Sequence, residues 1–301
     1  MGSRVTDMPT LFESLRISTG MINNFLAMSL LTYSVYLSMR AGIFSVAGVA
    51  FGALGGYVAG NIAMAGGGAV PALAAATGIS AVIGVALSVM LRRIRRLYLT
   101  MATFAFVLLT QVLVKNGGDL TGGQYGLFGI PKLLGTSGLL ATVAMVGAFV
   151  YLLERGVFGR TFEALRTDEQ LARTMGIDVA FWRGVTFTLS AALGGLAGSA
   201  NALQIGLVTP DAAGFEVIVD VLTILVVGGT GAWYGPILGT FVVVWLPELL
   251  SFSGEWRTIV QGLIVIAIVV YAPNGAVGLI GRIRLPRIGR TSADPQPQVE
   301  K

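Results

Sequence analysis

Two carboxylates, Glu216 and Asp220, are spaced one helical turn apart near the start of a long apolar run. An ionisable side chain at membrane depth costs about 2.5–3.5 kcal/mol on insertion scales, so it normally faces a water-filled cavity or a protein partner. We expect both residues to line a pathway for a solute, and Asp220 is the stronger candidate because it lies deeper in the run. A polar contact with a neighbouring subunit is the alternative.

The residue inventory excludes several kinds of chemistry. The 301 residues include no histidine and no cysteine. Histidine is the commonest general base and a frequent metal ligand, and cysteine supplies thiol nucleophiles and disulfides. Histidine triads, His-containing zinc sites and thiol chemistry are therefore ruled out. The remaining Asp, Glu, Lys, Ser and Tyr residues form no paired constellation, so we expect neither catalysis nor a metal site on this chain.

A charged segment, Gly159–Asp178, separates two apolar stretches, Leu133–Leu153 and Gly184–Pro210, that contain no Asp, Glu, Lys or Arg. Its apolar residues Leu165, Leu171, Met175 and Ile177 recur near helical spacing among the charges, and Gly176 is a natural helix stop. The pattern predicts an amphipathic helix that lies parallel to a membrane and contacts a partner. A solvated loop without a partner is the alternative.

Two glycine-rich segments complete the set of motifs. Leu120–Pro131 has the glycine density of tight turns and close backbone approach, and is either a structured loop or a place where substrate is admitted. Gly228–Pro236 interrupts an apolar run, which is tolerated only where protein or a water-filled cavity surrounds it. The sequence leaves open whether this break is a cytoplasmic turn or a broken helix. The phosphate-binding pattern G-x-x-x-x-G-K-[ST] is absent, so the chain does not hydrolyse ATP by that route.

The composition is that of an integral membrane protein. Hydrophobic residues make up 54% of the chain and charged residues 12%, with a mean hydropathy of +0.80, whereas soluble domains carry about 25% charged residues. Apolar runs of span length predict an all-α integral membrane protein with roughly eight to nine transmembrane helices and a cytoplasmic helix. The net charge of +5 does not indicate nucleic acid, because the basic residues concentrate in alternate loops, as the positive-inside rule expects.

The basic loops also give the domain organisation. We place Arg92–Arg96, Arg155–Arg183 and the segment after Arg282 in the cytoplasm. Residues 1–20 form an N-terminal segment, residues 21–281 the transmembrane domain with residues 155–183 as its cytoplasmic segment, and residues 282–301 a disordered cytoplasmic tail. If the glycine-punctuated segment Ala41–Asn61 crosses fully, the N-terminus lies outside, and if it is broken or re-entrant, the N-terminus lies inside. The spacing Gly48/Gly52/Gly56/Gly60 predicts close helix packing.

Several motifs together point to a known family. They are Gly42–Ser45, Leu97–Thr100, Leu120–Pro131, Gly159–Asp178, Leu189–Ala202 with Pro210, and Gly228–Thr240. In this order, from about Leu26 to Gly281, they resemble the permease of branched-chain amino acid ABC importers. The outer-loop pattern Thr-Gly-Gly…Gly-Leu…Gly-Ile-Pro resembles the second of the two permease types of that heteromeric pair.

The resemblance implies a transport subunit rather than an enzyme. Its protein partners would be ABC ATPase subunits that carry ATP and Mg, a second homologous permease and an extracytoplasmic substrate-binding protein. The chain would lie in the lipid bilayer of a bacterial inner membrane and would itself bind no cofactor. In the family the charged segment docks onto the ATPase. By resemblance, the coupling positions are Glu163, Ala164, Arg166, Asp168, Glu169, Ala172, Met175 and Gly176. The candidate residues of the translocation pathway are Asp220, Glu216, Gly228, Gly229, Gly231, Ser45, Thr121, Gly122 and Gly123.

One departure from the family pattern concerns the substrate. The first glycine-rich span of the family reads Ser-x-Gly-x-Ala-x-Phe followed by Gly-Ala-Tyr, whereas this chain has Ser45–Phe51 and then Gly55–Tyr57, without the polar or histidine residue often found after the glycine. Branched-chain or related amino acids are the expected substrates, and urea or short amides are the alternative. An ion-coupled secondary transporter would use Glu216 and Asp220 but would leave the charged segment without a purpose.

Overall fold

The computed structural model describes residues 19–91, 94 and 96–249, together with residues 262, 266, 275, 277 and 278. The predicted tail lies outside the described residues, as does nearly all of the N-terminal segment. The same holds for most of the basic loop 92–96 and for most of residues 250–281, an apolar stretch at the end of the predicted transmembrane domain.

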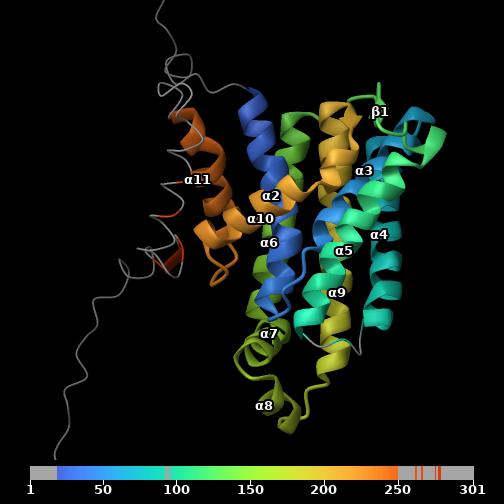
Figure 1. The fold of residues 1–301 in the computed structure, drawn as a ribbon. Coiled ribbons are helices and arrows are strands. Elements are labelled where there is room, and N and C mark those ends of the chain that lie inside the picture. Colours follow the sequence, from blue (N-terminus) through green and yellow to red (C-terminus); the bar gives the residue numbers. More distant parts are fainter. Residues whose placement is uncertain are drawn as a thin grey trace, which may run out of the picture.

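Helices dominate the described residues, which confirms the prediction of an all-α integral membrane protein (Figure 1). The helices are α2 (Thr19–Arg40), α3 (Ala47–Met64), α4 (Ala69–Leu91), α5 (Arg96–Lys115), α6 (Thr136–Arg155), α7 (Val157–Thr167), α8 (Glu169–Thr174), α9 (Val179–Ile205), α10 (Phe215–Gly228) and α11 (Gly235–Leu249). Short 3₁₀ turns, η1 (Gly118–Leu120) and η2 (Pro210–Ala213), and two short strands, β1 (Leu127–Phe128) and β2 (Leu207–Val208), complete the elements. Among the described residues five helices are long and apolar enough to cross a membrane, in α3, α4, α5, α6 and α9.

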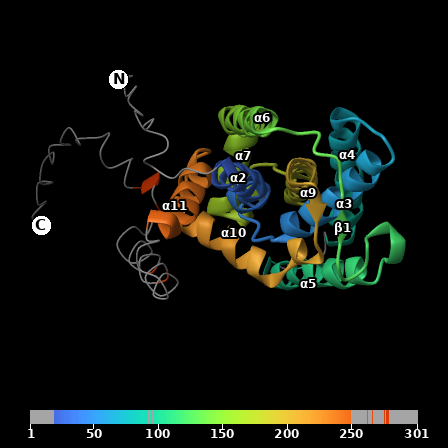
Figure 2. The same ribbon diagram turned by 90° about the horizontal axis from the view of Figure 1, so that it is seen from above.

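Helix α2 is also long, at 22 residues, but its composition is more polar. Its buried face carries hydroxyl side chains that bond carbonyl groups of their own helix: Ser29 Oγ lies 2.7 Å from Phe25 O, and Thr32 Oγ1 lies 2.7 Å from Met28 O. Such internal bonds satisfy the hydroxyl groups without water. A helix that packs on protein rather than lipid can therefore carry them, and α2 lies in the interior of the bundle, with α9, between α6 on one side and α5 and α10 on the other (Figure 2).

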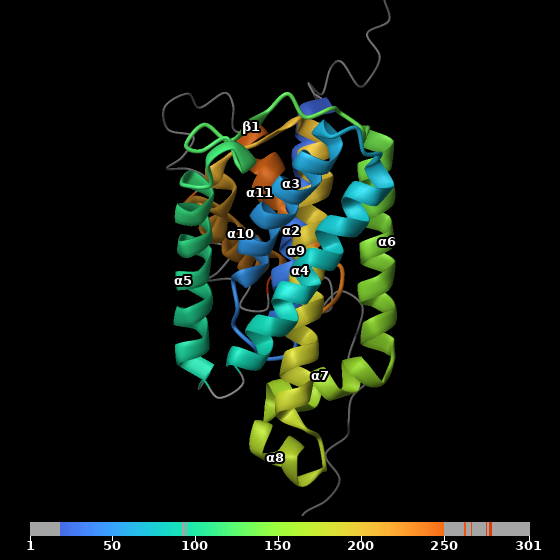
Figure 3. The same ribbon diagram turned by 90° about the vertical axis from the view of Figure 1, so that its right-hand side faces the viewer.

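The chain direction settles how residues 41–61 run. Helix α2 descends to Arg40 at the end of the bundle that carries α7 and α8, and residues 43–46 then return without helical structure to the middle of the bundle, where α3 begins and rises to the opposite end (Figures 1 and 3). The segment thus runs the full height, partly as non-helical chain, so Thr19 lies at the end opposite α7 and α8. Because the end of α4 at Leu91, the start of α5 at Arg96 and residues 155–183 lie at the α7–α8 end, the positive-inside rule predicts that this end faces the cytoplasm.

The centre of the bundle is a crossing of α3 and α9 in which the two backbones touch. A Cβ atom built on Gly198 would lie 1.7 Å from the carbonyl oxygen of Gly52, and one on Gly55 would lie 2.3 Å from the carbonyl oxygen of Gly195. Only glycine allows helices to approach this closely. The prediction that the glycine spacing serves helix packing is confirmed, with α9 as the partner.

The break at Gly228–Pro236 is a turn inside the bundle, not a turn at the cytoplasmic end. Helix α10 runs across the bundle at about mid-height, and α11 rises from the turn toward the end opposite α7 and α8 (Figures 1 and 2). A Cβ atom on Gly228 would lie 2.1 Å from Gly235 O, and Gly229 has a φ of 87°. Gly275, from the last apolar run, packs on this turn, where its Cβ would lie 2.6 Å from Gly229 N. Surrounding protein therefore covers a break that lipid would not tolerate.

Candidate functional site

The first candidate site consists of α7 and α8, which lie across one end of the bundle (Figure 3). Helix α7 starts directly after α6 at a sharp corner: a Cβ on Gly159 would lie 1.9 Å from Glu154 O. Helix α8 then starts at Asp168, whose carboxylate accepts hydrogen bonds from the backbone N–H groups of Gln170, at 2.8 Å, and Leu171, at 3.2 Å. The predicted single amphipathic helix is therefore two helices, because Asp168 acts as an N-cap rather than as a helix interior residue. The predicted stop at Gly176 is confirmed, with a φ of 82°.

Both short helices are fixed on α9. Phe158 and Phe162 of α7 meet the ring of Trp182, with ring centroids 5.0 and 6.4 Å apart. Glu169 of α8 accepts from Arg183 of α9, with Nη2 lying 2.7 Å from Oε1 and 2.9 Å from Oε2. Ring contacts and a partly buried ion pair hold a surface more firmly than exposed single pairs do. The α7–α8 surface is thus a platform anchored to α9.

A hollow of 390 Å³ opens on this platform. It is lined by Arg160, Glu163, Ala164, Thr167, Asp168, Leu171, Ala172 and Met175. Five of the eight predicted coupling residues lie there: Glu163, Ala164, Asp168, Ala172 and Met175. Of the other three, Glu169 is turned toward Arg183, while Arg166 and Gly176 are exposed outside the lining. Sequence reasoning missed Arg160 and Thr167, which the helical spacing from Glu163 could have added, and it named Leu171 as an apolar residue of the helix but not as a coupling position.

A second hollow, a cavity of 780 Å³, lies toward the outer end. Helices α2, α3 and α9 form its walls, with β2, η2 and the start of α10 at its rim. Its polar lining residues are Asn24, Gln111, Asn201, Thr209, Asp211 and Glu216. The charged groups of the lining are the carboxylates of Asp211 and Glu216, and Lys115 lies outside it with its Nζ 3.9 Å from Asp211 Oδ1. The cavity therefore offers amide groups and negative charge to a solute.

The structure brings one of the predicted pathway residues, Glu216, to this cavity. Asp220 lies one turn further along α10, is exposed, and is outside the lining. Gly228, Gly229 and Gly231 belong to the turn between α10 and α11, away from the cavity. The sequence reasoning missed Asn24 and Asn201, and the available signal was the presence of amide side chains within two apolar runs, Asn23 and Asn24 in one and Asn201 and Gln204 in the other.

Ser45 and the outer loop have structural roles in this arrangement. Ser45 is buried before α3, where its Oγ lies 3.3 Å from the backbone nitrogen of Ala47. Thr121 donates its hydroxyl to Val114 O at 2.7 Å, and Gly122 and Gly123 both have positive φ, so this part of the loop is a tight turn. None of these four residues lines the cavity.

The outer loop nonetheless reaches the cavity rim through a small sheet. Strand β1 pairs antiparallel with β2, with Leu127 opposite Val208 and Phe128 opposite Leu207, and both β2 residues line the cavity. A Cβ on Gly126 would lie 2.2 Å from Val208 O, so this contact requires glycine. In the part of the chain that the structure describes, no group of three or more Asp or Glu residues is placed to hold a metal ion.

Comparison with known proteins agrees with these features. The family described as "Branched-chain amino acid transport system / permease component" matches residues 18–269. The high-affinity branched-chain amino acid transport system permease protein LivM of Salmonella typhimurium is 29% identical over 231 residues, 65% of this chain and 54% of that protein. The LivM of Escherichia coli is 29% identical over 217 residues, 61% and 51% of the two chains. The autoinducer 2 import system permease protein LsrC of Shigella flexneri is 29% identical over 174 residues, 55% and 51% of the two chains.

The chain spans about half the length of the curated relatives it matches. No solved structure matches it. The family match nevertheless covers most of the chain and includes the α7–α8 platform, the outer cavity and the break between α10 and α11. The chain is a multi-pass membrane transport subunit and belongs to the family of branched-chain amino acid transport system permease components.

Proposed function

We propose that the chain is a permease subunit of an ATP-driven importer, with ATP and Mg bound by a separate ATPase that docks on the α7–α8 platform. A second, homologous permease and an extracytoplasmic substrate-binding protein would complete the assembly in a bacterial inner membrane. The family match supports the import function. The absence of a phosphate-binding loop in the sequence supports placing hydrolysis on another chain.

The observation that carries the proposal is the apolar surface of α8. Leu171 and Met175 lie beside the 390 Å³ hollow and remain 57% and 70% exposed, although the platform around them is anchored to α9 and charged. Exposed apolar side chains rimmed by charges at a preformed hollow are typical of a protein interface. At the cytoplasmic end of a permease, an ATPase is the partner that such an interface would serve.

For the substrate, we infer a small amino acid, of the branched-chain or a related type. The cavity combines small and apolar wall residues such as Ala53 and Gly198 with the carboxylates of Asp211 and Glu216. Negative charge suits the ammonium group of an amino acid, whereas urea and short amides carry no charge for it to attract. Urea and short amides are the second candidates, because the amides of Asn24 and Asn201 could bind them equally well.

The function is tested by purifying the tagged chain from membranes in mild detergent and identifying the proteins that remain bound. We expect an ATPase and a second permease to co-purify, and the complex in proteoliposomes to take up a branched-chain amino acid only with ATP and binding protein. Recovery of the chain alone at good yield, with uptake that follows an ion gradient, would contradict the proposal and favour a secondary transporter.

The cavity is tested separately through Glu216. We expect Glu216→Gln to lower uptake of an amino acid about tenfold, which corresponds to about 1.4 kcal/mol, because the substitution removes a charge that faces the cavity but keeps the side-chain size. Asp119→Asn is the matched control, since Asp119 is exposed in the outer loop and does not line the cavity. Equal uptake by both variants, measured with radiolabelled substrate, would exclude Glu216 from the pathway.

A further inference from the structure

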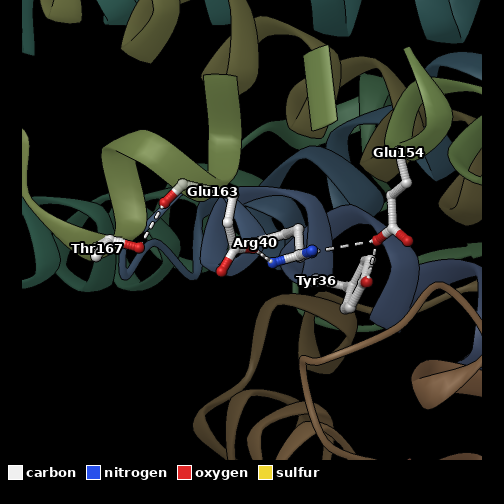
Figure 4. A network of polar contacts seen from close by, with 5 residues as sticks. All are labelled: Tyr36, Arg40, Glu154, Glu163 and Thr167. Carbon is white, nitrogen blue, oxygen red and sulfur yellow. Dashed lines mark hydrogen bonds and ion pairs between the residues drawn. The ribbon is translucent and has the colours of Figure 1, made fainter. Parts of the chain in front are cut away.

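Arg40 lies where three helices meet. It is the last residue of α2, and its guanidinium reaches Glu154 of α6, with Nε 3.4 Å from Oε1, and Glu163 of α7, with Nη1 2.5 Å from Oε2 (Figure 4). The Tyr36 hydroxyl, one turn earlier in α2, donates a hydrogen bond to the same Glu154 oxygen. Figure 4 shows the two carboxylates on opposite sides of the guanidinium.

This cluster differs from an ordinary surface ion pair because most of it is buried. The side chains of Arg40 and Glu154 are only 14% and 15% exposed, and Tyr36 is fully buried. Exposed pairs contribute little, but a buried carboxylate that loses its cation is left with an uncompensated charge. The planar fork of arginine can bond two carboxylates at once, which a lysine cannot do with the same geometry.

The cluster also stands between the two hollows. Its outermost member, Glu163, lines the hollow on the α7–α8 platform. Helix α2, which ends at Arg40, supplies Asn24, Ala27, Met28 and Leu31 to the wall of the outer cavity. Because α2 is one continuous helix from Thr19 to Arg40, a displacement of its cytoplasmic end shifts the cavity wall as well.

We propose that Arg40 is a positioning residue that passes the displacement of α7 to α2, and so links partner docking at the platform to opening of the outer cavity. Apolar packing attaches α7 as well: its aromatic residues join it to α9, Phe162 belongs to the same buried core as Leu37 of α2, and the peptide chain joins it to α6. Within the described residues, the ion pair of Arg40 with Glu163 is the charged link between α2 and α7. The inference rests on the proposed function, since it requires an ATPase at the platform.

The natural absence of cysteine makes a direct test possible. A single Met28→Cys substitution places a thiol in the cavity wall, and its reaction with a maleimide reports whether the cavity is open. The purified complex with its ATPase is reconstituted in nanodiscs, and the labelling rate of the permease is compared with and without ATP, alongside the rate of ATP hydrolysis. Wild-type Arg40 should give an ATP-dependent change in labelling rate.

We expect Arg40→Gln to reduce that ATP-dependent change about tenfold, a coupling of the usual size between sites, while ATP hydrolysis stays within about twofold of the parent. Arg40→Lys should restore the response in part, because it keeps the charge but not the fork. Lys132→Gln, which removes an exposed cation from the outer loop, should leave both rates unchanged.

Arg40→Lys covers the case in which Arg40→Gln does not fold, because it keeps a cation beside Glu154 and Glu163 and lies outside the lining of the docking hollow. A lost labelling response with retained hydrolysis supports the inference. A full response in both variants, or a parallel fall of hydrolysis and response, overturns it, because the cluster would then be dispensable or merely structural. If the parent complex itself shows no response to ATP, the proposed function fails instead.

Discussion

A single methyl group added at Gly198 should destabilise the protein by about 3 kcal/mol or more. The methyl carbon would lie 1.7 Å from the carbonyl oxygen of Gly52, at the crossing of α9 and α3. That oxygen belongs to a helix backbone, so it cannot rotate away as a side chain would, and the two helices would have to separate. Because van der Waals packing is the main attraction between helices in a membrane, their separation removes most of what holds this pair together.

The expected result can be measured as the temperature at which the detergent-solubilised chain loses its monodisperse elution peak. Gly78→Ala is the matched control: it makes the same chemical change in α4 at an exposed position, where no atom lies within 4 Å of the new Cβ. That variant should be neutral or slightly stabilising, since alanine favours a helix by up to about 1 kcal/mol over glycine.

Gly55→Ala separates packing from any effect on the cavity. Gly55 does not line the cavity, yet its Cβ would lie 2.3 Å from Gly195 O at the same crossing. It should therefore lower stability as Gly198→Ala does. If both variants melt like the control, the backbones of α3 and α9 are not in contact in the membrane protein, and the arrangement of the bundle is wrong at its centre.

The sequence predicted those features that depend on one segment at a time. Apolar runs of span length predicted the helices, whereas the assignment of the α7–α8 end to the cytoplasm from the basic loops stays a prediction. The glycine spacing from Gly48 to Gly60 predicted that α3 packs closely. It could not identify α9 as the partner, because a glycine stripe permits close approach to any helix with small residues and does not select one.

Features that depend on the meeting of distant segments were missed. Asn24 and Asn201 share one cavity, but they belong to separate apolar runs, and only the packing of α2 beside α9 brings them together and selects them over Asn23 and Gln204. The break at Asp168 was missed for a different reason. The helical period of the charged segment continues across it, and an aspartate can equally occupy an exposed helix position or an N-cap.

The preference for Asp220 over Glu216 remains a prediction that the structure does not favour, since Glu216 is the one beside the cavity.

The second large effect is expected on α8. Replacing both Leu171 and Met175 by glutamate should weaken binding of the ATPase about 100-fold, which corresponds to about 2.7 kcal/mol, because interface energy concentrates in a few apolar side chains that become desolvated on docking. Both side chains are mostly exposed, so the substitution should leave the fold of the platform intact. The measurement is the dissociation constant of the ATPase for the permease in nanodiscs, with the melting temperature of each variant as the test of folding.

Charge must be separated from loss of apolar contact in this experiment. Gln170→Glu adds a negative charge to the same helix at an exposed position outside the hollow, and it should bind the ATPase nearly as well as the parent. Leu171→Ala with Met175→Ala removes the apolar groups without adding charge, and should weaken binding almost as much as the glutamate pair. If the alanine pair binds normally and only the glutamates fail, repulsion is the cause and the apolar pair is not the docking contact. If all the variants bind normally, the ATPase docks on another surface. The ion pair of Glu163 with Arg40 would then no longer link the docking site to α2.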